Sequence, residues 1–401
     1  MRKDSLVFIA LVIALVFPSP TLPQSSTSGL MSKSPRIDLK ALTNKAHEGN
    51  PEAQYQLGLA YQDGLGIEKS EYEAMRWYRS AANSGHTQAQ NNLAYLYETG
   101  PDAIKNMGEA VKWYKRAAVY GSVLAQFNLG RLYLDGRGVK QSNEEAAHWF
   151  QKAADGGHAD ALAALALMYA SGSGVPQDLV KALKLTKKAV KGHSLAGEAV
   201  LGILYLEGLG VSKDFSEGVK HLEKAAQSGN AAGQYTLGLL YHTGQSVKKD
   251  TEQAIRLLRL AAEQGTIPAQ AALGQIYEYG QGIRADSKEA AIWYRQAADQ
   301  GDAESATRLG RLFLLGQGMD KNVDEAVKLF TLAAEQGNPY AQFNLAELYA
   351  SGSSVKRDLQ RAFSLYSLAG KTLDVSEQLK QISSLLKQDE PTASPRAASQ
   401  Q

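Results

Sequence analysis

The sequence predicts an all-α repeat protein, a solenoid of helix-turn-helix units. The strongest observation is a period of 36 residues, at which nine leucines recur without insertion. They are Leu57, Leu93, Leu129, Leu165, Leu201, Leu237, Leu273, Leu309 and Leu345. Each is followed at once by glycine or alanine and four residues later by an aromatic side chain. Because such units stack rather than enlarge one core, we expect a single array instead of two or three globular domains.

Each repeat contains the pattern of two amphipathic helices, as residues 50–85 show. Leu57 and Tyr61 lie on one apolar stripe of a first helix, and Trp77 lies on the stripe of a second helix. Gly64 stands between the two, and a glycine occupies this place in all nine repeats. Glycine suits the position just past a helix end because it adopts the left-handed conformation without a Cβ clash. We therefore expect helix, short loop, helix and turn in every repeat.

Side chains that cap helix N-termini precede both helices of the repeat. The position before the second helix holds Ser70, Asn106, Ser142, Asp178, Asp214, Asp250, Asp286, Asn322 and Asp358. Glutamate or glutamine follows three residues later in seven repeats, which predicts a capping box, while Lys181 and Arg361 stand there in the other two. The position before the first helix holds Asn50, Ser122, Ser194, Asn230, Thr266, Asp302 and Asn338, with His86 and His158 in the remaining repeats.

The small residue after each repeated leucine predicts close packing. We interpret the Leu-Gly-x-x-Tyr stretch as the seam along which first helices pack, with glycine or alanine setting their approach. His193, Gly197 and Gly233 depart from the pattern of the other repeats. We therefore expect a slightly irregular superhelix near residues 185–240.

The amino terminus predicts export. Arg2 and Lys3 precede a run of twelve apolar residues at 6–17, which is too short to span a bilayer comfortably. We interpret residues 1–23 as a cleaved secretory signal, with an uncleaved amino-terminal anchor as the alternative. The Ser-rich residues 24–36 predict a flexible linker. The protein is accordingly expected to be periplasmic or secreted, and tethered to the membrane only if this segment stays uncleaved.

The rest of the chain divides by repeat register. Residues 37–49 predict an amino-terminal capping half-repeat, and residues 50–373 contain the nine repeats. Residues 374–387 predict a carboxy-terminal capping helix, because Asp374 begins an amphipathic stretch there. Residues 388–401 have nothing to bury and predict a disordered tail.

Composition and motifs exclude several function classes. The net charge of +2 gives no basic excess for nucleic acid, and the absence of cysteine excludes disulfides, thiolate catalysis and zinc–thiolate sites. The seven histidines show no ligand spacing. The Gly-x-Gly loops follow a helix, whereas a dinucleotide fingerprint follows a strand, so we interpret them as turns. We predict no catalytic residue, no cofactor and no metal site.

The repeat resembles a known family. Residues 122–157 and 266–301 best match the pattern Ala-Gln-x-x-Leu-Gly-x-x-Tyr-x-x-Gly-x-Gly-Val-x-x-Asp-x-x-x-Ala-x-x-Trp-Tyr-x-x-Ala-Ala-x-x-Gly. This pattern is similar to the Sel1-like repeat, a relative of the tetratricopeptide repeat, and the likeness covers about residues 50–370. The resemblance implies a right-handed α-α superhelix that serves as an adaptor, scaffold or regulator. Exported bacterial members are commonly linked to envelope signalling, surface structures or host contact.

The same resemblance implies that the first helices line the concave face, where two variable columns are candidates for binding a partner. One column presents aromatic side chains at Tyr55, Phe127, Tyr235 and Phe343. The other carries Tyr95, Arg131, Leu167, Ile203, Leu239 and Arg311. These residues predict a groove for an extended peptide or helix of a partner protein. The alternative is that they pack against neighbouring first helices.

Three functions stay open from the sequence. The leading hypothesis is a non-catalytic protein–protein interaction scaffold of the exported compartment, which binds a partner protein or peptide along the concave face. The alternative is a binder of cell-wall glycan or peptidoglycan, in which the aromatic side chains stack on sugar rings. A hydrolase is the weakest hypothesis, because the repeat accounts for nearly every polar residue that a catalyst would need.

Overall fold

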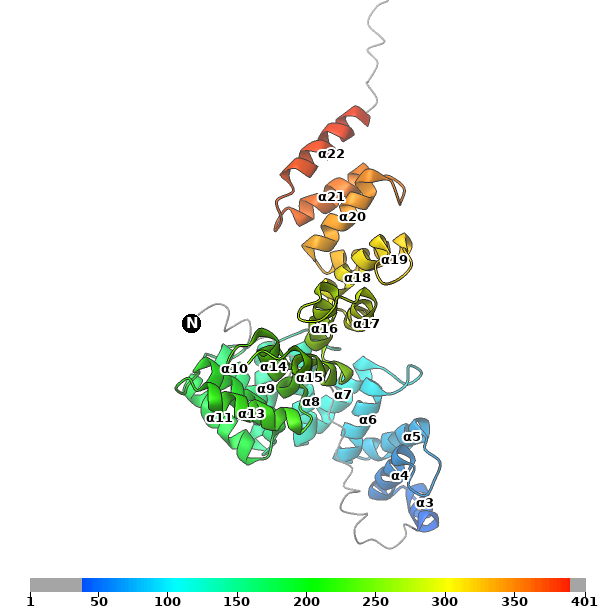
Figure 1. Ribbon diagram of the computed structural model, residues 1–401. Helices are drawn as coiled ribbons and strands as arrows, with labels where there is room; N and C mark the ends of the chain where they lie inside the picture. Colours follow the sequence, from blue (N-terminus) through cyan, green and yellow to red (C-terminus); the bar gives the residue numbers. More distant parts are fainter. Residues whose placement is uncertain (1–37, 390–401) are drawn as a thin grey trace, which may run out of the picture. The chain divides into compact units, whose positions relative to one another are not determined.

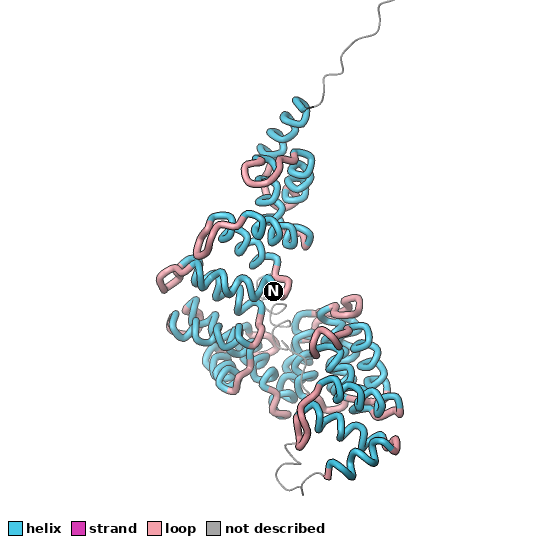
Figure 2. Tube along the Cα trace, turned by 90° about the vertical axis from the view of Figure 1, so that its right-hand side faces the viewer, coloured by secondary structure: helices cyan, strands magenta, loops and turns pink. Residues whose placement is uncertain are grey.

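The computed structural model describes residues 38–389, and within this range it contains twenty helices and no strand (Figures 1 and 2). This confirms the predicted all-α class of paired-helix repeats. The expected signal or anchor, the linker and nearly all of the tail lie outside the described residues. No helix between residues 38 and 389 combines the length and apolarity that crossing a bilayer requires. The chain divides into two compact bodies, Met1–Lys249 and Asp250–Gln401, which are described separately.

The first body alternates between the first and second helices of successive repeats. It begins with α3 (Leu39–His47), which packs against α4. The first helices are α4 (Pro51–Asp63), α6 (Thr87–Thr99), α8 (Val123–Asp135), α10 (Ala159–Ser171), α12 (Leu195–Glu207) and α14 (Ala231–Thr243). The second helices are α5 (Glu71–Asn83), α7 (Met107–Val119), α9 (Asn143–Asp155), α11 (Leu179–Lys191) and α13 (Phe215–Gln227). Each second helix packs against the first helix of its own repeat and against that of the next.

The second body continues the alternation and closes with one further helix. Its second helices are α15 (Thr251–Glu263), α17 (Ser287–Asp299), α19 (Val323–Glu335) and α21 (Leu359–Ala369). Its first helices are α16 (Ile267–Tyr279), α18 (Ala303–Leu315) and α20 (Pro339–Ser351). The last helix, α22 (Ser376–Asp389), packs on α21, where Val375 and Ile382 are buried among apolar side chains.

The helices begin at the N-cap residues that the sequence predicts. Before every second helix the cap side chain accepts a hydrogen bond from the backbone N–H three residues later. Eight of the nine first helices are capped in the same way, and Thr266 is the exception.

Only one of the two hydrogen bonds of the predicted capping box forms, the one that the cap side chain accepts. In the eight repeats that lie whole within one body, the backbone N–H of the second-helix cap donates to the carbonyl of the repeat's aromatic residue, as Ser70 does to Tyr61. That N–H is therefore unavailable to the glutamate three residues later. Glu109 accepts hydrogen bonds from Lys112 and Trp113 instead.

The glycines at the ends of the first helices are left-handed in eight repeats, as predicted. Gly100 is extended instead (φ −65°, ψ 176°), because Pro101 follows it and disfavours the helical region for the residue before it. His193 and Ser246 keep a positive φ of 61° and 67° where other repeats have glycine. Backbone strain is therefore concentrated at these two turns.

The repeated Leu-Gly stretch packs differently from our interpretation. A Cβ at Gly58 would lie 2.5 Å from the Tyr78 ring, and a Cβ at Gly130 would lie 2.7 Å from the Phe150 ring. These rings belong to the second helix of the same repeat, so the small residue sets the spacing within a repeat rather than between first helices. The alanine column of the second helices lies in the same core and is fully buried at Ala81, Ala117, Ala153, Ala189, Ala225, Ala261, Ala297, Ala333 and Ala369.

Two glycines on first helices lie against preceding second helices near residues 185–240, where we expected an irregular superhelix. A Cβ at Gly197 would lie 2.8 Å from the Ala189 Cβ, and a Cβ at Gly233 would lie 2.7 Å from the Ala225 Cβ. In the same part of the first body, α12 contacts both α10 and α14. Gly197 and Gly233 thus let α12 and α14 lie close to the preceding second helices, α11 and α13.

We predict that Gly130→Ala lowers the free energy of unfolding by about 1–3 kcal/mol, because the added methyl group overpacks the contact with Phe150. Gly108→Ala is the matched control, since the nearest atom to its Cβ, Asn106 Oδ1, is 3.4 Å away. That control should be neutral or stabilising by up to about 1 kcal/mol. Urea unfolding followed by circular dichroism measures both; equal stability of Gly130→Ala and the parent would contradict the packing argument.

Candidate functional site

The ten side chains predicted to face a partner all lie on first helices. In the first body they are Tyr55 on α4, Tyr95 on α6, Phe127 and Arg131 on α8, Leu167 on α10, Ile203 on α12, and Tyr235 and Leu239 on α14. In the second body they are Arg311 on α18 and Phe343 on α20. The structure thus divides the candidates between two bodies.

Half of these residues are buried. Phe127, Arg131, Leu167, Ile203 and Tyr235 are buried, so the expectation that they lie on an exposed face is corrected. Tyr55, Tyr95, Leu239 and Phe343 are half-buried, and Arg311 is exposed. That any of the ten binds a partner stays a prediction.

Two physical causes of this burial are visible. The Tyr55 ring stacks on the His86 ring with centroids 4.6 Å apart, and Phe127 stacks on His158 at 4.4 Å. Each aromatic side chain therefore covers the histidine that caps the next first helix. Leu167 and Ile203 lie on α10 and α12, which contact each other directly.

A buried polar pair on α8 has unmet hydrogen-bonding capacity. Asn128 and Arg131 are three residues apart and therefore share a helix face. They are 0% and 2% exposed. Neither side-chain atom of the Asn128 amide has a hydrogen-bond partner, and neither do Nε and Nη1 of Arg131. On α6 the neighbouring amides of Asn91 and Asn92 are also buried, and Asn91 Oδ1 is unpaired.

The charges around Arg131 balance one another. Glu98 accepts a hydrogen bond from the Tyr114 hydroxyl at 3.0 Å and forms an ion pair with Arg137 at 2.9 Å. Burial lowers the pKa of Arg131, while Glu98 and Asp135 act in the opposite direction. Burial likewise raises the pKa of Asp135, which Arg131 and Arg137 oppose. Two arginines and two carboxylates thus compensate each other.

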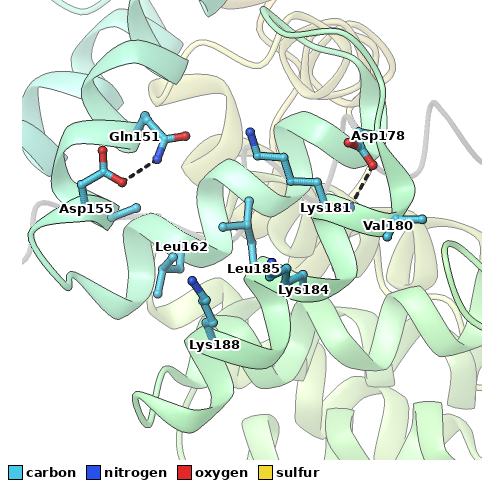
Figure 3. A pocket seen from close by; sticks show the side chains of 10 residues that line it. Gln151, Asp155, Leu162, Asp178, Val180, Lys181, Lys184, Leu185 and Lys188 are labelled. Carbon is cyan, nitrogen blue, oxygen red and sulfur yellow. Dashed lines mark hydrogen bonds between the residues drawn. The ribbon is translucent and has the colours of Figure 1, made fainter.

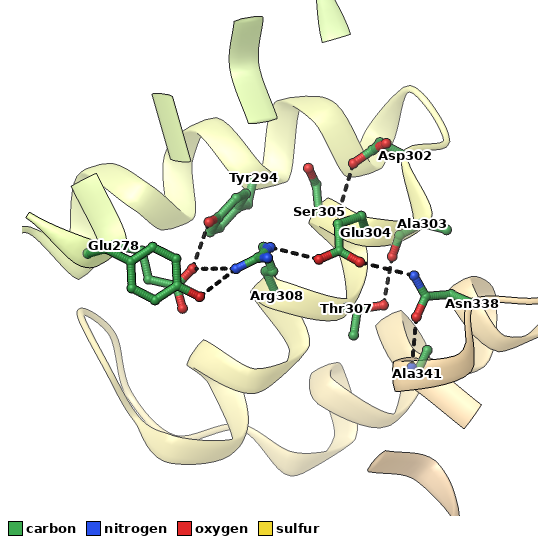
Figure 4. Close-up of polar contacts among 11 residues, drawn as sticks. Glu278, Tyr294, Asp302, Ala303, Glu304, Ser305, Thr307, Arg308, Asn338 and Ala341 are labelled. Carbon is green, nitrogen blue, oxygen red and sulfur yellow. Dashed lines mark hydrogen bonds and ion pairs between the residues drawn. The ribbon is translucent and has the colours of Figure 1, made fainter. Parts of the chain in front are cut away.

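In the second body, Arg308 stands at the position of Asn128 immediately before the repeated leucine, and its side chain is paired (Figure 4). Its guanidinium contacts Glu278 at 3.3 Å and Glu304 at 2.9 Å, and it donates to the Tyr279 hydroxyl at 2.6 Å. Glu304 also accepts from the Asn338 amide at 3.3 Å. This network joins α16, α18 and the cap of α20, so it is structural, and Arg308 has no buried atom without a hydrogen-bond partner.

A glutamine in the first turn of the first helix links one repeat to the next. Its amide donates to the carbonyl of the alanine eight residues earlier, at the end of the preceding second helix. The six glutamines are Gln54, Gln90, Gln126, Gln234, Gln270 and Gln342. Leu162, Glu198 and Ala306 replace it in the other repeats.

Glu198 makes a different connection. It is buried and accepts from His221 Nδ1 at 2.7 Å and from Lys224 Nζ at 2.5 Å. Burial alone would raise the pKa of Glu198, but these two hydrogen bonds hold it below its usual range. Glu198 therefore connects α12 to α13 within one repeat through hydrogen bonds to basic side chains. The glutamine at this position elsewhere connects successive repeats through a hydrogen bond to a backbone carbonyl.

Leu162 makes no such connection, and a cavity of about 600 Å³ opens beside it (Figure 3). Leu162, Ala154 and Leu185 form its apolar part. Lys181, Lys184 and Lys188 of α11 line it, together with Gln151 and Asp155 of α9 and with Asp178 and Val180. Within residues 38–389, no group of histidine and acidic side chains is placed to hold a metal ion.

A family model described as Sel1 repeat matches nine segments of the sequence, one per repeat. They are residues 51–86, 87–118, 123–158, 159–193, 196–230, 231–266, 267–302, 303–338 and 339–371. The chain belongs to the Sel1 repeat family. Sel1 repeats are typically protein–protein interaction scaffolds and are generally non-catalytic.

Solved structures of other Sel1 repeat proteins are similar to this chain. The Sel1 repeat protein from Oxalobacter formigenes is 25% identical, with a TM-score of 0.51, over 97% of this chain and 94% of that one. The protective antigen c5321 of uropathogenic Escherichia coli, which displays an SLR fold, is 32% identical over 86% of this chain and 82% of that one (TM-score 0.47). The immunity protein Pa5087 from Pseudomonas aeruginosa is 21% identical over 54% and 82% (TM-score 0.41). No match was found among curated proteins.

Sequence reasoning missed two features of this Sel1 repeat array. Asn128 escaped notice, although asparagine immediately before the repeated leucine recurs only at Asn92 and Asn344. The lysine-lined cavity was also missed. Its signals were the loss of the recurring glutamine at Leu162 and the lysine at 181 where most repeats have an acidic or amide side chain.

We predict a pH-dependent stability from the cap of α10. His158 Nδ1 accepts from the Ala161 N–H, which requires a neutral ring, and burial lowers its pKa below the ordinary 6.5 while Asp160 acts oppositely. The unfolded chain therefore binds this proton first as the pH falls. The stabilisation is present above 6.5 and is lost as the pH falls from there through the folded-state pKa.

Urea unfolding between about pH 8 and about pH 5 tests this. His158→Asn should reduce the loss of stability at the lower pH, because asparagine caps other first helices and does not titrate. His148→Asn is the control, as His148 is exposed on α9 and caps nothing. An unchanged pH dependence in His158→Asn would refute the assignment.

Proposed function

We propose that this Sel1 repeat protein is a non-catalytic scaffold of the exported compartment that binds an extended segment of a partner protein on the first helices of its first body. The observation that carries the proposal is the unmet hydrogen bonding of Asn128 and Arg131. Leaving a buried polar group unpaired costs about 1–3 kcal/mol, and native structures contain few such groups. A bound partner that supplied the missing hydrogen bonds would recover this free energy.

The chemistry of the pair favours peptide main chain as the ligand. An amide side chain donates and accepts, and an extended peptide presents both N–H and C=O groups at a rise of about 3.3 Å per residue. The Arg131 nitrogens only donate. Because Glu98 and Asp135 already oppose the charge of Arg131, a neutral carbonyl is a better match than a further carboxylate.

Aromatic side chains on the preceding first helices also favour partner binding on this face. Tyr55 and Tyr95 are half-buried and keep some exposed surface, and tyrosine is enriched in the energetically important centres of interfaces. Asn128 and Arg131 are buried in the free chain, so side chains around them must move when a partner enters. Such side-chain rearrangement is common at interfaces.

Glycan binding receives less support from the geometry. Stacking on a sugar needs an open aromatic face, but the Phe127 ring is buried against His158 and the Tyr55 ring is stacked on His86. Export itself is proposed from Arg2, Lys3 and the apolar run at 6–17. The mass of the protein recovered from the exported fraction would test it, since signal cleavage removes roughly the first two dozen residues.

We predict that Asn128→Leu combined with Arg131→Met separates binding from stability. The substitutions remove unpaired buried polar atoms but also one positive charge beside Glu98 and Asp135. Because Arg137 still compensates these two carboxylates, the variant should stay folded and unfold at a urea concentration close to that of the parent. Peptides selected from a random library on the parent protein should bind the variant at least about tenfold more weakly, which corresponds to about 1.4 kcal/mol. Fluorescence anisotropy measures the affinity.

Asn344→Leu is the matched control, because it makes the same change in the same column of the second body. It should leave peptide affinity unchanged. Equal affinity of the double variant and the parent would place binding elsewhere, and strong destabilisation would show that the pair is structural. If no peptide is selected and the protein sediments with purified cell wall, the glycan alternative is favoured.

A further inference from the structure

We propose that the cavity between α9 and α11 is a second docking site, which takes an acidic, partly apolar segment of a partner protein. It is lined mainly by second helices, whereas the proposed peptide face lies on first helices. The two sites therefore belong to different surfaces of the first body, and this site does not depend on the first.

The cavity lies where a connection between repeats is missing. In six repeats a glutamine amide donates to the alanine carbonyl eight residues earlier, as Gln126 does to Ala118. The equivalent pair in the fourth repeat is Leu162 and Ala154, and both line the cavity. Leucine cannot donate to that carbonyl, so the space that the glutamine crosses elsewhere stays open and gains an apolar wall.

The charge of α11 indicates what this space accepts. The helix carries five lysines, at 181, 184, 187, 188 and 191, and no acidic residue. Lys181, Lys184 and Lys188 line the cavity (Figure 3). Lys181 is held in place, because its ammonium donates to the Tyr169 hydroxyl at 2.6 Å and lies 4.0 Å from the Tyr169 ring centroid.

The acidic residues beside the cavity are already engaged. Asp155 accepts from the Gln151 amide at 2.8 Å, and Asp178 caps α11 by accepting from the Lys181 N–H at 2.9 Å. In the described part of the chain, Lys184 and Lys188 form no ion pair with either of them. Both lysines are exposed and are free to meet carboxylates of a partner.

The apolar lining selects among anionic partners. Leu162, Leu185 and Ala154 form the apolar part of the cavity, and Val180 at its edge is 75% exposed. A segment with glutamate or aspartate beside leucine or phenylalanine satisfies both the lysines and this lining. A phosphate polymer has no apolar side chain to place there.

The test uses the full-length protein and short synthetic peptides in fluorescence-anisotropy titrations. One peptide contains glutamate and leucine, and a second contains glutamate and serine at the same net charge. Lys184→Glu combined with Lys188→Glu should weaken binding of the glutamate–leucine peptide at least about tenfold, equivalent to about 1.4 kcal/mol. Lys187→Glu combined with Lys191→Glu makes the same charge change on the same helix, but neither lysine lines the cavity. This control should weaken binding less than about threefold, because its charges act on the peptide only through solvent, where salt screens them.

A third variant tests the cavity itself. Leu162→Gln introduces the side chain that six other repeats carry, so it should fold normally and close the space by donating to the Ala154 carbonyl. It should weaken the glutamate–leucine peptide about tenfold and leave the weaker glutamate–serine peptide unchanged.

Three results would overturn the proposal. Unchanged affinity in Lys184→Glu with Lys188→Glu would exclude the lysines, and unchanged affinity in Leu162→Gln would exclude the cavity. Tighter and lysine-dependent binding of a DNA duplex or of anionic lipid vesicles would assign the surface to a different class of partner.

Discussion

A side-chain bond across the repeat boundary is the interaction on which the array depends. The glutamine amide in the first turn of a first helix donates to an alanine carbonyl at the end of the preceding second helix, as Gln90 does to Ala82 at 3.1 Å. The bond is buried and uses a carbonyl at a helix end, where backbone acceptors lack intrahelical partners. In the six repeats that have it, the bond therefore helps to fix the direction in which a first helix leaves the preceding helix.

Spacing within a repeat depends on a second constraint, the small residue after the repeated leucine, which at Gly58, Gly130, Gly274 and Gly310 lies against an aromatic ring. Gly58 meets Tyr78 and Gly130 meets Phe150 so closely that a methyl group would not fit at the present distance. The two constraints act on different contacts, one between repeats and one inside a repeat. Their combination explains why the period tolerates large variation at other positions.

Periodicity was enough to predict the helices, their caps and the glycine ends, because those features are decided by residues near in sequence. It could not predict burial of Phe127 and Arg131, since a column's exposure depends on how closely successive first helices approach and on what stacks upon them. Periodicity also led us to expect that the Leu-Gly stretch packs against another first helix, whereas it packs against the second helix of the same repeat. A small residue in a pattern indicates a close approach but does not identify the helix that approaches. The pattern also predicted a complete capping box of which only half forms, because the carbonyl of the repeat's aromatic residue accepts the hydrogen bond from the cap N–H.

The two binding surfaces proposed here lie where a column of structurally equivalent residues is broken. Arg308 stands in the column of Asn128 and is fully paired with Glu278 and Glu304, so it serves the fold (Figure 4). Asn128 has no such partners, and Leu162 lacks the amide that ties other repeats together. A repeat protein keeps its stability when one unit loses a connection, because its neighbours still supply theirs. That tolerance gives this chain room for two chemically different surfaces, one with unmet hydrogen bonds and one with unmatched positive charge.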